Sequence, residues 1–307
     1  MSEIACMFCD LVRWVISELA IYVPWLTWEN IKIFANSSFT TSLAGAFAGA
    51  WGAQLIATRV KLRDELQSEL RNTNTGIMLA HSIASIAYSL KKQHVKALKE
   101  SYDNDCKAFE AFNQKPEAER AKAPLELAIN VDRIDVISTP IATIQEIVMG
   151  KISTTGRAIA SVSALAGAIG NLNDALTGRN ELLAKIKEEK LPAGAELHHY
   201  YFGLEYAKGK SNLEFGHYVN ALSLYTNHVI FFSVKLCDDL REHGLHVAKK
   251  HKEKLGGKAP DVSNADWSKG EQEGMIPKDE DFKDWLSGFQ SRPQPKRRWW
   301  QLWKPDA

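Results

Sequence analysis

Hydrophobic positions divide the chain into three regions with different patterns. An uncharged run of 26 residues extends from Ile33 to Thr58. Apolar residues then recur at steps of three and four through most of residues 59–256, which is the spacing of amphipathic helices. Residues 257–307 are mainly polar and contain several prolines. We therefore expect an all-α chain: N-terminal membrane-associated helices, an elongated antiparallel helical bundle and a disordered tail.

The uncharged run predicts a transmembrane helix over residues 38–58, since a helix needs about 20 predominantly apolar residues to cross a bilayer. Gly45 and Gly49 stand four residues apart, and Gly52 and Ala53 follow one turn later. Small residues at this spacing let two membrane helices approach closely, so we expect these four to pack against a second copy. The alternative is a tightly packed helix inside a soluble domain, because several Ser, Thr and Gln side chains lower the hydrophobicity of the run.

Basic residues beside the run indicate its orientation. Arg59, Lys61 and Arg63 follow it directly, whereas residues 1–58 contain only two basic side chains. Basic residues are enriched on the cytoplasmic side of membrane helices. We therefore expect an inner- or plasma-membrane protein with residues 59–256 in the cytoplasm.

The nine tryptophans gather at the two ends of the chain. Tryptophan favours the membrane–water interface because its ring is apolar and its N–H needs a partner. Residues 3–24 predict an amphipathic helix that either spans the membrane or lies in the interface, and Arg13 and Glu18 near its middle favour the interface. Besides the three basic residues after the run, those expected at the interface are Trp14, Trp25 and Trp28.

Periodic apolar seams in residues 59–256 predict three or four long helices separated by short breaks, and we find no convincing strand alternation there. Such helices are typical of an antiparallel bundle. One step of the first seam is skipped at Arg179. The clearest seams are Val162, Leu165, Ile169, Leu172, Leu176, Leu183 and Ile186, and then Phe215, Tyr218, Leu222, Tyr225, Val229, Phe232 and Leu236.

The last region combines an acidic part with a basic, aromatic end. Residues 260–284 contain eight acidic and three basic side chains, which predicts a disordered linker. Basic charge interleaved with aromatic rings at the end of the chain favours an anionic lipid surface, then a protein partner, then nucleic acid. The residues expected to bind are Lys296, Arg297, Arg298, Trp299, Trp300 and Trp303.

Charge and residue chemistry indicate no enzymatic activity. The 38 basic and 37 acidic residues argue against a dedicated nucleic-acid binder. Four scattered cysteines are too few for a disulfide scaffold. We find no catalytic motif and predict no catalytic residues, no metal and no cofactor. The alternative is an enzyme with a metal site at His243 and His246, which share a helix face with Asp239 and Glu242 nearby.

These patterns predict a non-enzymatic, oligomeric membrane protein whose cytoplasmic bundle receives a signal or a protein partner. The order of its parts, a Gly/Ala-rich run at Gly45–Gly52 followed by a helical domain, resembles membrane-anchored effectors of bacterial anti-phage defence systems. This resemblance covers the order of parts and implies a membrane-perturbing, antiviral role. The alternatives are a membrane-tethered adaptor or scaffold and a histidine-site enzyme.

Overall fold

The computed structural model describes residues 38–289, apart from positions 124, 128, 155 and 189. The helix expected at residues 3–24, the interfacial Trp14, Trp25 and Trp28, and the binding residues of the tail from Lys296 to Trp303 lie outside the described residues. Those expectations therefore stay predictions.

The described residues are mainly helical, as predicted, and contain one short antiparallel strand pair in which Glu205 pairs with Ser211 and Ala207 with Lys210. The elements are α3 (Ser38–Leu90), the π-helix η1 (Lys91–Val95), α4 (Lys96–Asn113), α5 (Glu117–Arg120), α6 (Ile141–Gly150), α7 (Arg157–Lys187), α8 (Leu197–Phe202), β1 (Glu205–Ala207), β2 (Lys210–Ser211), α9 (Glu214–Leu255), α10 (Ser268–Gln272), the 3-10 helix η2 (Asp279–Phe282) and α11 (Lys283–Ser287).

The chain divides into two compact units, one ending at Glu65 and the other beginning at Leu66, and α3 contributes to both. In the first unit, residues 38–65 are helical, in agreement with the predicted helix over residues 38–58. None of the helices that the structure describes combines the length and the apolar character needed to cross a membrane. The predicted transmembrane helix is therefore corrected: its glycines and polar side chains, such as Gln54, dilute the apolar residues.

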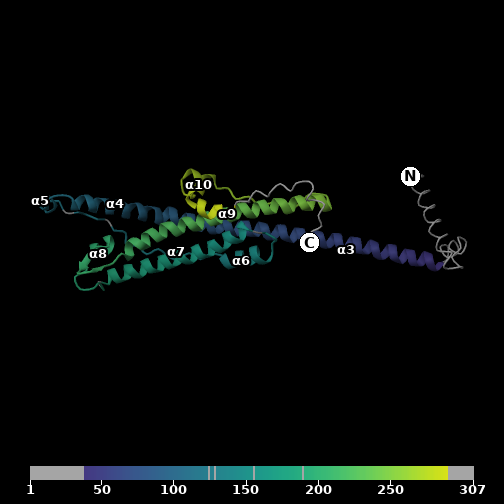
Figure 1. The fold of residues 1–307 in the computed structure, drawn as a ribbon, viewed down its shortest axis with the longest axis horizontal. Helices are drawn as coiled ribbons and strands as arrows, with labels where there is room; N and C mark the ends of the chain where they lie inside the picture. Colours follow the sequence, from purple (N-terminus) through teal and green to yellow (C-terminus); the bar gives the residue numbers. More distant parts are fainter. Residues whose placement is uncertain (1–37, 124, 128, 155, 189, 290–307) are drawn as a thin grey trace, which may run out of the picture. The chain divides into compact units, whose positions relative to one another are not determined.

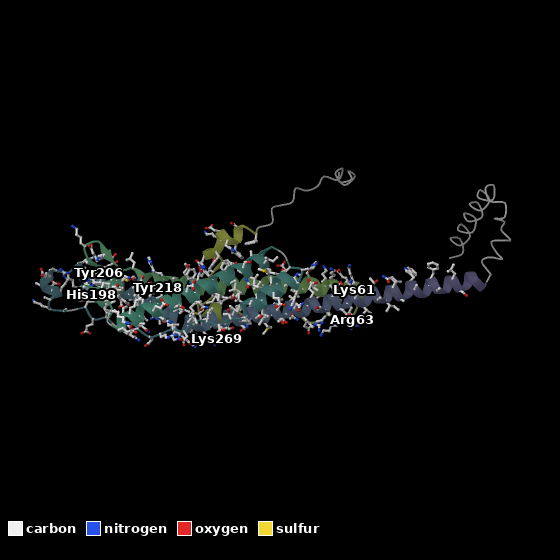
Figure 2. All side chains as sticks on the ribbon, turned by 90° about the horizontal axis from the view of Figure 1, so that it is seen from below. Lys61, Arg63, His198, Tyr206, Tyr218 and Lys269 are labelled. Carbon is white, nitrogen blue, oxygen red and sulfur yellow. The ribbon has the colours of Figure 1, made fainter. Side chains whose placement is uncertain are left out.

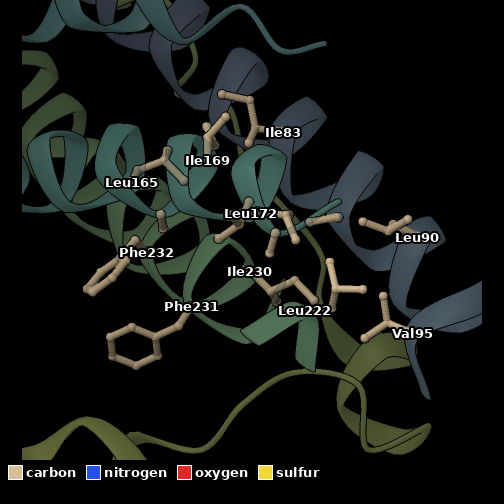
Figure 3. Packing of buried hydrophobic residues seen from close by; sticks show 14 of the residues in the cluster. Ile83, Leu90, Val95, Leu165, Ile169, Leu172, Leu222, Ile230, Phe231 and Phe232 are labelled. Atoms are coloured by element: carbon tan, nitrogen blue, oxygen red, sulfur yellow. The ribbon is translucent and has the colours of Figure 1, made fainter. Parts of the chain in front are cut away.

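In the second unit, three long helical stretches enclose one hydrophobic core: the later part of α3 with α4, then α7, then α9 (Figure 1). Most residues of the two predicted seams are buried in this core, which confirms the seams. Figure 3 shows Ile83 of α3 close to Ile169 and Leu172 of α7, with Leu222 and Ile230 of α9 beside them. Helix α9 ends at Leu255, one residue before the predicted end of the bundle.

The direction of the helices differs in part from an up-and-down bundle. Helices α7 and α9 are antiparallel, because Arg157 pairs with Asp239 while Gly178 lies against Tyr218. Helix α9 is likewise antiparallel to α3 and α4. Helix α7 therefore runs parallel to α3 and α4. This is possible because residues 129–140, none of which is helical, return the chain along the bundle before α6 begins.

Residues 257–289, which we name the C-terminal strap, differ from the expected disordered linker because they pack on the bundle. Asn74 of α3 donates to the carbonyl of Asp261 and accepts from the N–H of Ser263, both at 2.9 Å. Further along, Lys91 Nζ donates to the carbonyl oxygen of Met275 at 2.7 Å, and the Phe282 ring stacks on Phe231 at 3.7 Å between centroids. The strap thus contacts α3, η1 and α9 in turn.

Candidate functional site

A polar network joins α3, the α6–α7 loop and α9. Glu69 Oε1 accepts a hydrogen bond from the N–H of Ser153 at 2.9 Å and another from the Ser153 hydroxyl, and it lies 3.0 Å from His243 Nε2. Close by, Arg157 Nε donates to both carboxylate oxygens of Asp239, at 2.8 and 3.1 Å. These contacts fix the start of α7 against α9 and α3.

The electrostatics of this network favour a structural role, in which it holds α3, α7 and α9 together, over a catalytic one. Burial raises the pKa of Glu69, but the hydrogen bonds from Ser153 and the contact with His243 outweigh it, so the pKa lies below its usual value. The hydrogen bond to Asp239 raises the pKa of Arg157. In a catalytic triad the histidine stands between the nucleophile and the carboxylate. Here Glu69 holds both Ser153 and His243, so this order is absent from the network.

A cavity of about 690 Å³ opens beside the network and is lined partly by Glu242, His243 and His246. Over the part of the chain that the structure describes, no group of three His, Cys, Asp or Glu side chains could hold a metal ion. The residues of the alternative metal site are engaged elsewhere: His243 faces Glu69, and Asp239 pairs with Arg157. The alternative metal site therefore has no support from this geometry.

The first unit carries a different feature, a row of exposed large apolar side chains on α3. Leu43, Phe47, Trp51 and Leu55 follow one another at four-residue steps, and Phe47 and Trp51 are 69% and 70% exposed. Residues four apart lie on one side of a helix. We name these four residues the apolar stripe.

The predicted helix-packing residues lie on another side of α3 from this stripe. By helical periodicity, Gly45, Gly49 and Gly52 lie on the side of α3 opposite Phe47. A Cβ atom added at any of the three would meet nothing within 4 Å, and Ala53 is exposed. The glycines therefore form an open, small-residue face, and none of the other helices within residues 38–289 that the structure describes contacts it.

The predicted basic residues follow at the end of the first unit. Arg59, Lys61 and Arg63 are all exposed, and Figure 2 shows Lys61 and Arg63 along α3. Lys61 Nζ lies 3.8 Å from Glu65, an exposed pair one helical turn apart that contributes little to stability. Thr58 donates its hydroxyl to the carbonyl of Gln54 at 2.7 Å, so this polar group is satisfied within the helix. The region therefore presents apolar surface followed by positive charge.

Sequence reasoning missed a second set of polar residues, Asn173, Arg179 and Asn180 on α7. All three donate side-chain hydrogen bonds to main-chain carbonyls of residues 130–137. The only signal in the sequence is the step of the α7 seam that is skipped at Arg179, where an apolar residue would otherwise stand.

No family model, curated protein or solved structure matches this chain. Its geometry is therefore the basis for the function proposed below.

Proposed function

We propose that this chain is a non-enzymatic, oligomeric, membrane-associated protein whose helical bundle receives a signal or a protein partner on the cytoplasmic side. The observation that carries the proposal is the apolar stripe of α3, which is exposed although the same helix buries similar side chains a few turns later. Exposed apolar surface of this kind marks a contact with a membrane or a protein.

Lipid is the partner that best fits the chemistry of the stripe. Fully burying one large apolar side chain contributes about 1.5–3 kcal/mol, so four such residues supply enough driving force for membrane binding. Arg59, Lys61 and Arg63 follow the stripe, and each basic residue near an anionic surface adds about 1 kcal/mol. Trp51 within the stripe suits the membrane interface, where an apolar ring with one polar N–H is stable.

Self-association through the glycine face is the second part of the proposal. Glycine in a helix exposed to water costs about 1 kcal/mol relative to alanine, so three glycines within eight residues weaken α3. Close packing of two helices would offset that cost, because the missing side chains let the backbones approach. The open space around Gly45, Gly49 and Gly52 leaves room for a second copy.

The bundle is the part of the chain that, in this proposal, receives the signal or the protein partner. Its core is closed by α3, α7 and α9, and its polar network contains no arrangement that we can assign to catalysis. The resemblance of the order of parts to membrane-anchored effectors of bacterial defence gives the proposal its biological setting. In that setting, a signal received by the bundle would change the assembly of α3 at the membrane.

Vesicle flotation tests the membrane part directly. The full chain is mixed with vesicles containing anionic lipid, and the fraction that floats is measured for wild type and for Phe47→Glu with Trp51→Glu. We expect the double variant to bind at least tenfold more weakly, because two charges replace apolar contacts. Met78→Glu is the matched control, since Met78 is an exposed apolar residue of the same helix in the bundle. Equal flotation of all three proteins would contradict the proposal.

Cross-linking on vesicles tests the oligomeric part. Gly45→Leu and Gly49→Leu should abolish cross-linked species, whereas Gly167→Leu on α7, where a Cβ also meets nothing within 4 Å, should leave them unchanged. A membrane-potential dye during expression then separates the two functional alternatives. Depolarisation that is lost with Gly49→Leu would support an effector, and intact potential with normal assembly would support an adaptor or scaffold.

A further inference from the structure

An extended stretch of the chain lies along α7 and is held there through its main chain. Asn180 Nδ2 donates to the carbonyl of Ile134 at 2.7 Å, and its Oδ1 accepts from the Ile134 N–H at 3.2 Å. Asn173 makes the same pair of bonds with Ile137, at 3.0 and 2.9 Å. Each asparagine thus satisfies both main-chain groups of one residue, as a neighbouring β-strand would.

The spacing of these contacts matches an extended peptide. Asn173 and Asn180 are seven residues apart, which is about 10.5 Å along a helix at 1.5 Å per residue. Ile134 and Ile137 are three residues apart, which is about 10 Å along an extended chain. The match means that α7 recognises the repeat of an extended backbone, and these bonds are independent of the bound side chains.

Arg179 adds a buried positive charge to this face of α7. Its side chain is fully buried, and its guanidinium donates to the carbonyls of Asp132 at 2.8 Å and Asn130 at 3.1 Å. Its Nε has no hydrogen-bond partner among the described residues. Burial lowers the pKa of Arg179, and the nearby carboxylate of Asp132 offsets this only in part. A buried charge is costly unless it is hydrogen-bonded and paired, so the main-chain carbonyls of this stretch and the Asp132 carboxylate are what stabilise Arg179.

The stretch that fills this face is held loosely by its own side chains. Ile134 is buried and Ile137 half-buried, whereas Asp132 is exposed. Arg133 and Asp135 pair only with each other, and their side chains are 79% and 86% exposed. On the side of α3 lies an open cavity of about 530 Å³, lined by Ser82, Ser85, Ser89 and Ile134 among others. The stretch is therefore anchored by its backbone and by three apolar side chains, Val131, Ile134 and Ile137, as a bound peptide is.

We propose that the face of α7 formed by Asn173, Arg179 and Asn180 is a peptide-binding site, which residues 130–137 occupy in place of a partner's extended segment. The ligand it fits is an extended peptide with branched apolar residues three apart, as at Ile134 and Ile137. A carboxylate at the position of Asp132 would act on Arg179 as Asp132 does in the internal segment. The inference rests on the proposed function only in that the bundle has a protein partner.

A binding assay in solution tests this site without lipid, so its failure and the failure of membrane binding are distinguishable. The probe is a fluorescein-labelled peptide with the sequence of residues 128–139. The receptor is the full chain in which Ile134→Ser and Ile137→Ser remove two of the three apolar anchors of the internal segment. We expect saturable binding by fluorescence anisotropy that weakens at least tenfold when Asn173→Leu and Asn180→Leu are added. Asn220→Leu on the exposed side of α9 is the matched control and should change binding less than twofold.

A second measurement on the wild-type chain keeps the proposal falsifiable if the receptor variant fails to fold. A replaceable internal ligand must leave α7 by local opening, without unfolding of the bundle. We therefore expect the amides of Ile134 and Ile137 to exchange with deuterium at least tenfold faster than that of Leu222 in the core. Exchange of all three amides at one rate, or a folded receptor that does not bind the peptide, would overturn the proposal.

Discussion

The two parts of α3 have the same kinds of residue and opposite surroundings. In the first unit Leu55 is 53% exposed, whereas Leu70 in the bundle is fully buried. Both are leucines in the middle of one helix. The apolar pattern of a helix therefore shows that one side needs a packing partner, but it does not show whether that partner belongs to the same chain. The bundle supplies that partner for Leu70.

Glycines show the same contrast between the two regions. A Cβ at Gly76 or Gly244 in the bundle would lie about 3 Å from a neighbouring side chain, so these glycines allow close packing of α3, α9 and the C-terminal strap. At Gly45 and Gly49 a Cβ would meet nothing. The small residues of the bundle thus allow close packing within the chain. In the first unit we propose that they allow close packing against a second copy.

The largest loss of stability is expected from a substitution in the buried part of α3. Ile83→Ala should lower the free energy of unfolding by about 2–5 kcal/mol, because a fully buried side chain leaves a cavity in the core. Leu55→Ala should change it by less than about 0.5 kcal/mol, since an exposed side chain loses few contacts. Urea denaturation followed by circular dichroism measures both. A similar loss for the two variants would mean that Leu55 is buried by the folded chain in solution.

A second pair of variants tests, through changes in stability, whether the glycines of the two regions have different surroundings. Gly244→Ala should cost about 1–3 kcal/mol, because its Cβ would lie 2.9 Å from Val262 Cγ1 and 3.2 Å from Thr73 Cγ2. Gly49→Ala should instead stabilise the helix by up to about 1 kcal/mol, since alanine is the better helix former. Thermal melting at low protein concentration gives both values. Stabilisation by Gly244→Ala would show that the strap does not pack on α9.

A smaller change in stability is expected from the polar network of the bundle. The pKa of Glu69 is lowered in the folded chain, so the stability that its carboxylate contributes is present above its unfolded pKa. This stability is lost as the pH falls through the folded pKa. Glu69→Gln should therefore destabilise the chain by about 1 kcal/mol at pH 7 and by less at pH 3. Glu65→Gln, on the exposed surface of the same helix, is the control and should change the free energy of unfolding by less than about 0.5 kcal/mol at pH 7.

Much of the bundle could be predicted from the sequence. The seams of α7 and α9 were predictable because a three-four repeat of large apolar residues has one stable solution, a helix buried on one side. The course of residues 130–137 could not be predicted, because their hydrogen bonds come from Asn173, Arg179 and Asn180, and polar residues on a helix ordinarily face solvent. Such a contact depends on which segments meet after folding, and the local pattern does not contain that information.

The C-terminal strap and the polar network were missed for related reasons. The anchors of the strap, such as Met275 and Phe282, are scattered among acidic residues, and each fits a place that other helices create. Glu69 and His243 are 174 positions apart, so no spacing rule connects them. The exposed residues of the first unit, by contrast, were predictable as a group, because the glycines, the apolar residues and Arg59–Arg63 are close in sequence.

Hydrogen–deuterium exchange of the full chain, with and without vesicles containing anionic lipid, tests most directly whether the first part of α3 is a contact surface. Exposed helix exchanges readily, and burial against lipid and a second copy would slow it. We predict at least tenfold slower exchange with vesicles for peptides within residues 43–60, and unchanged exchange for peptides within α9. Unchanged exchange of residues 43–60, or equal slowing throughout the bundle, would contradict the account.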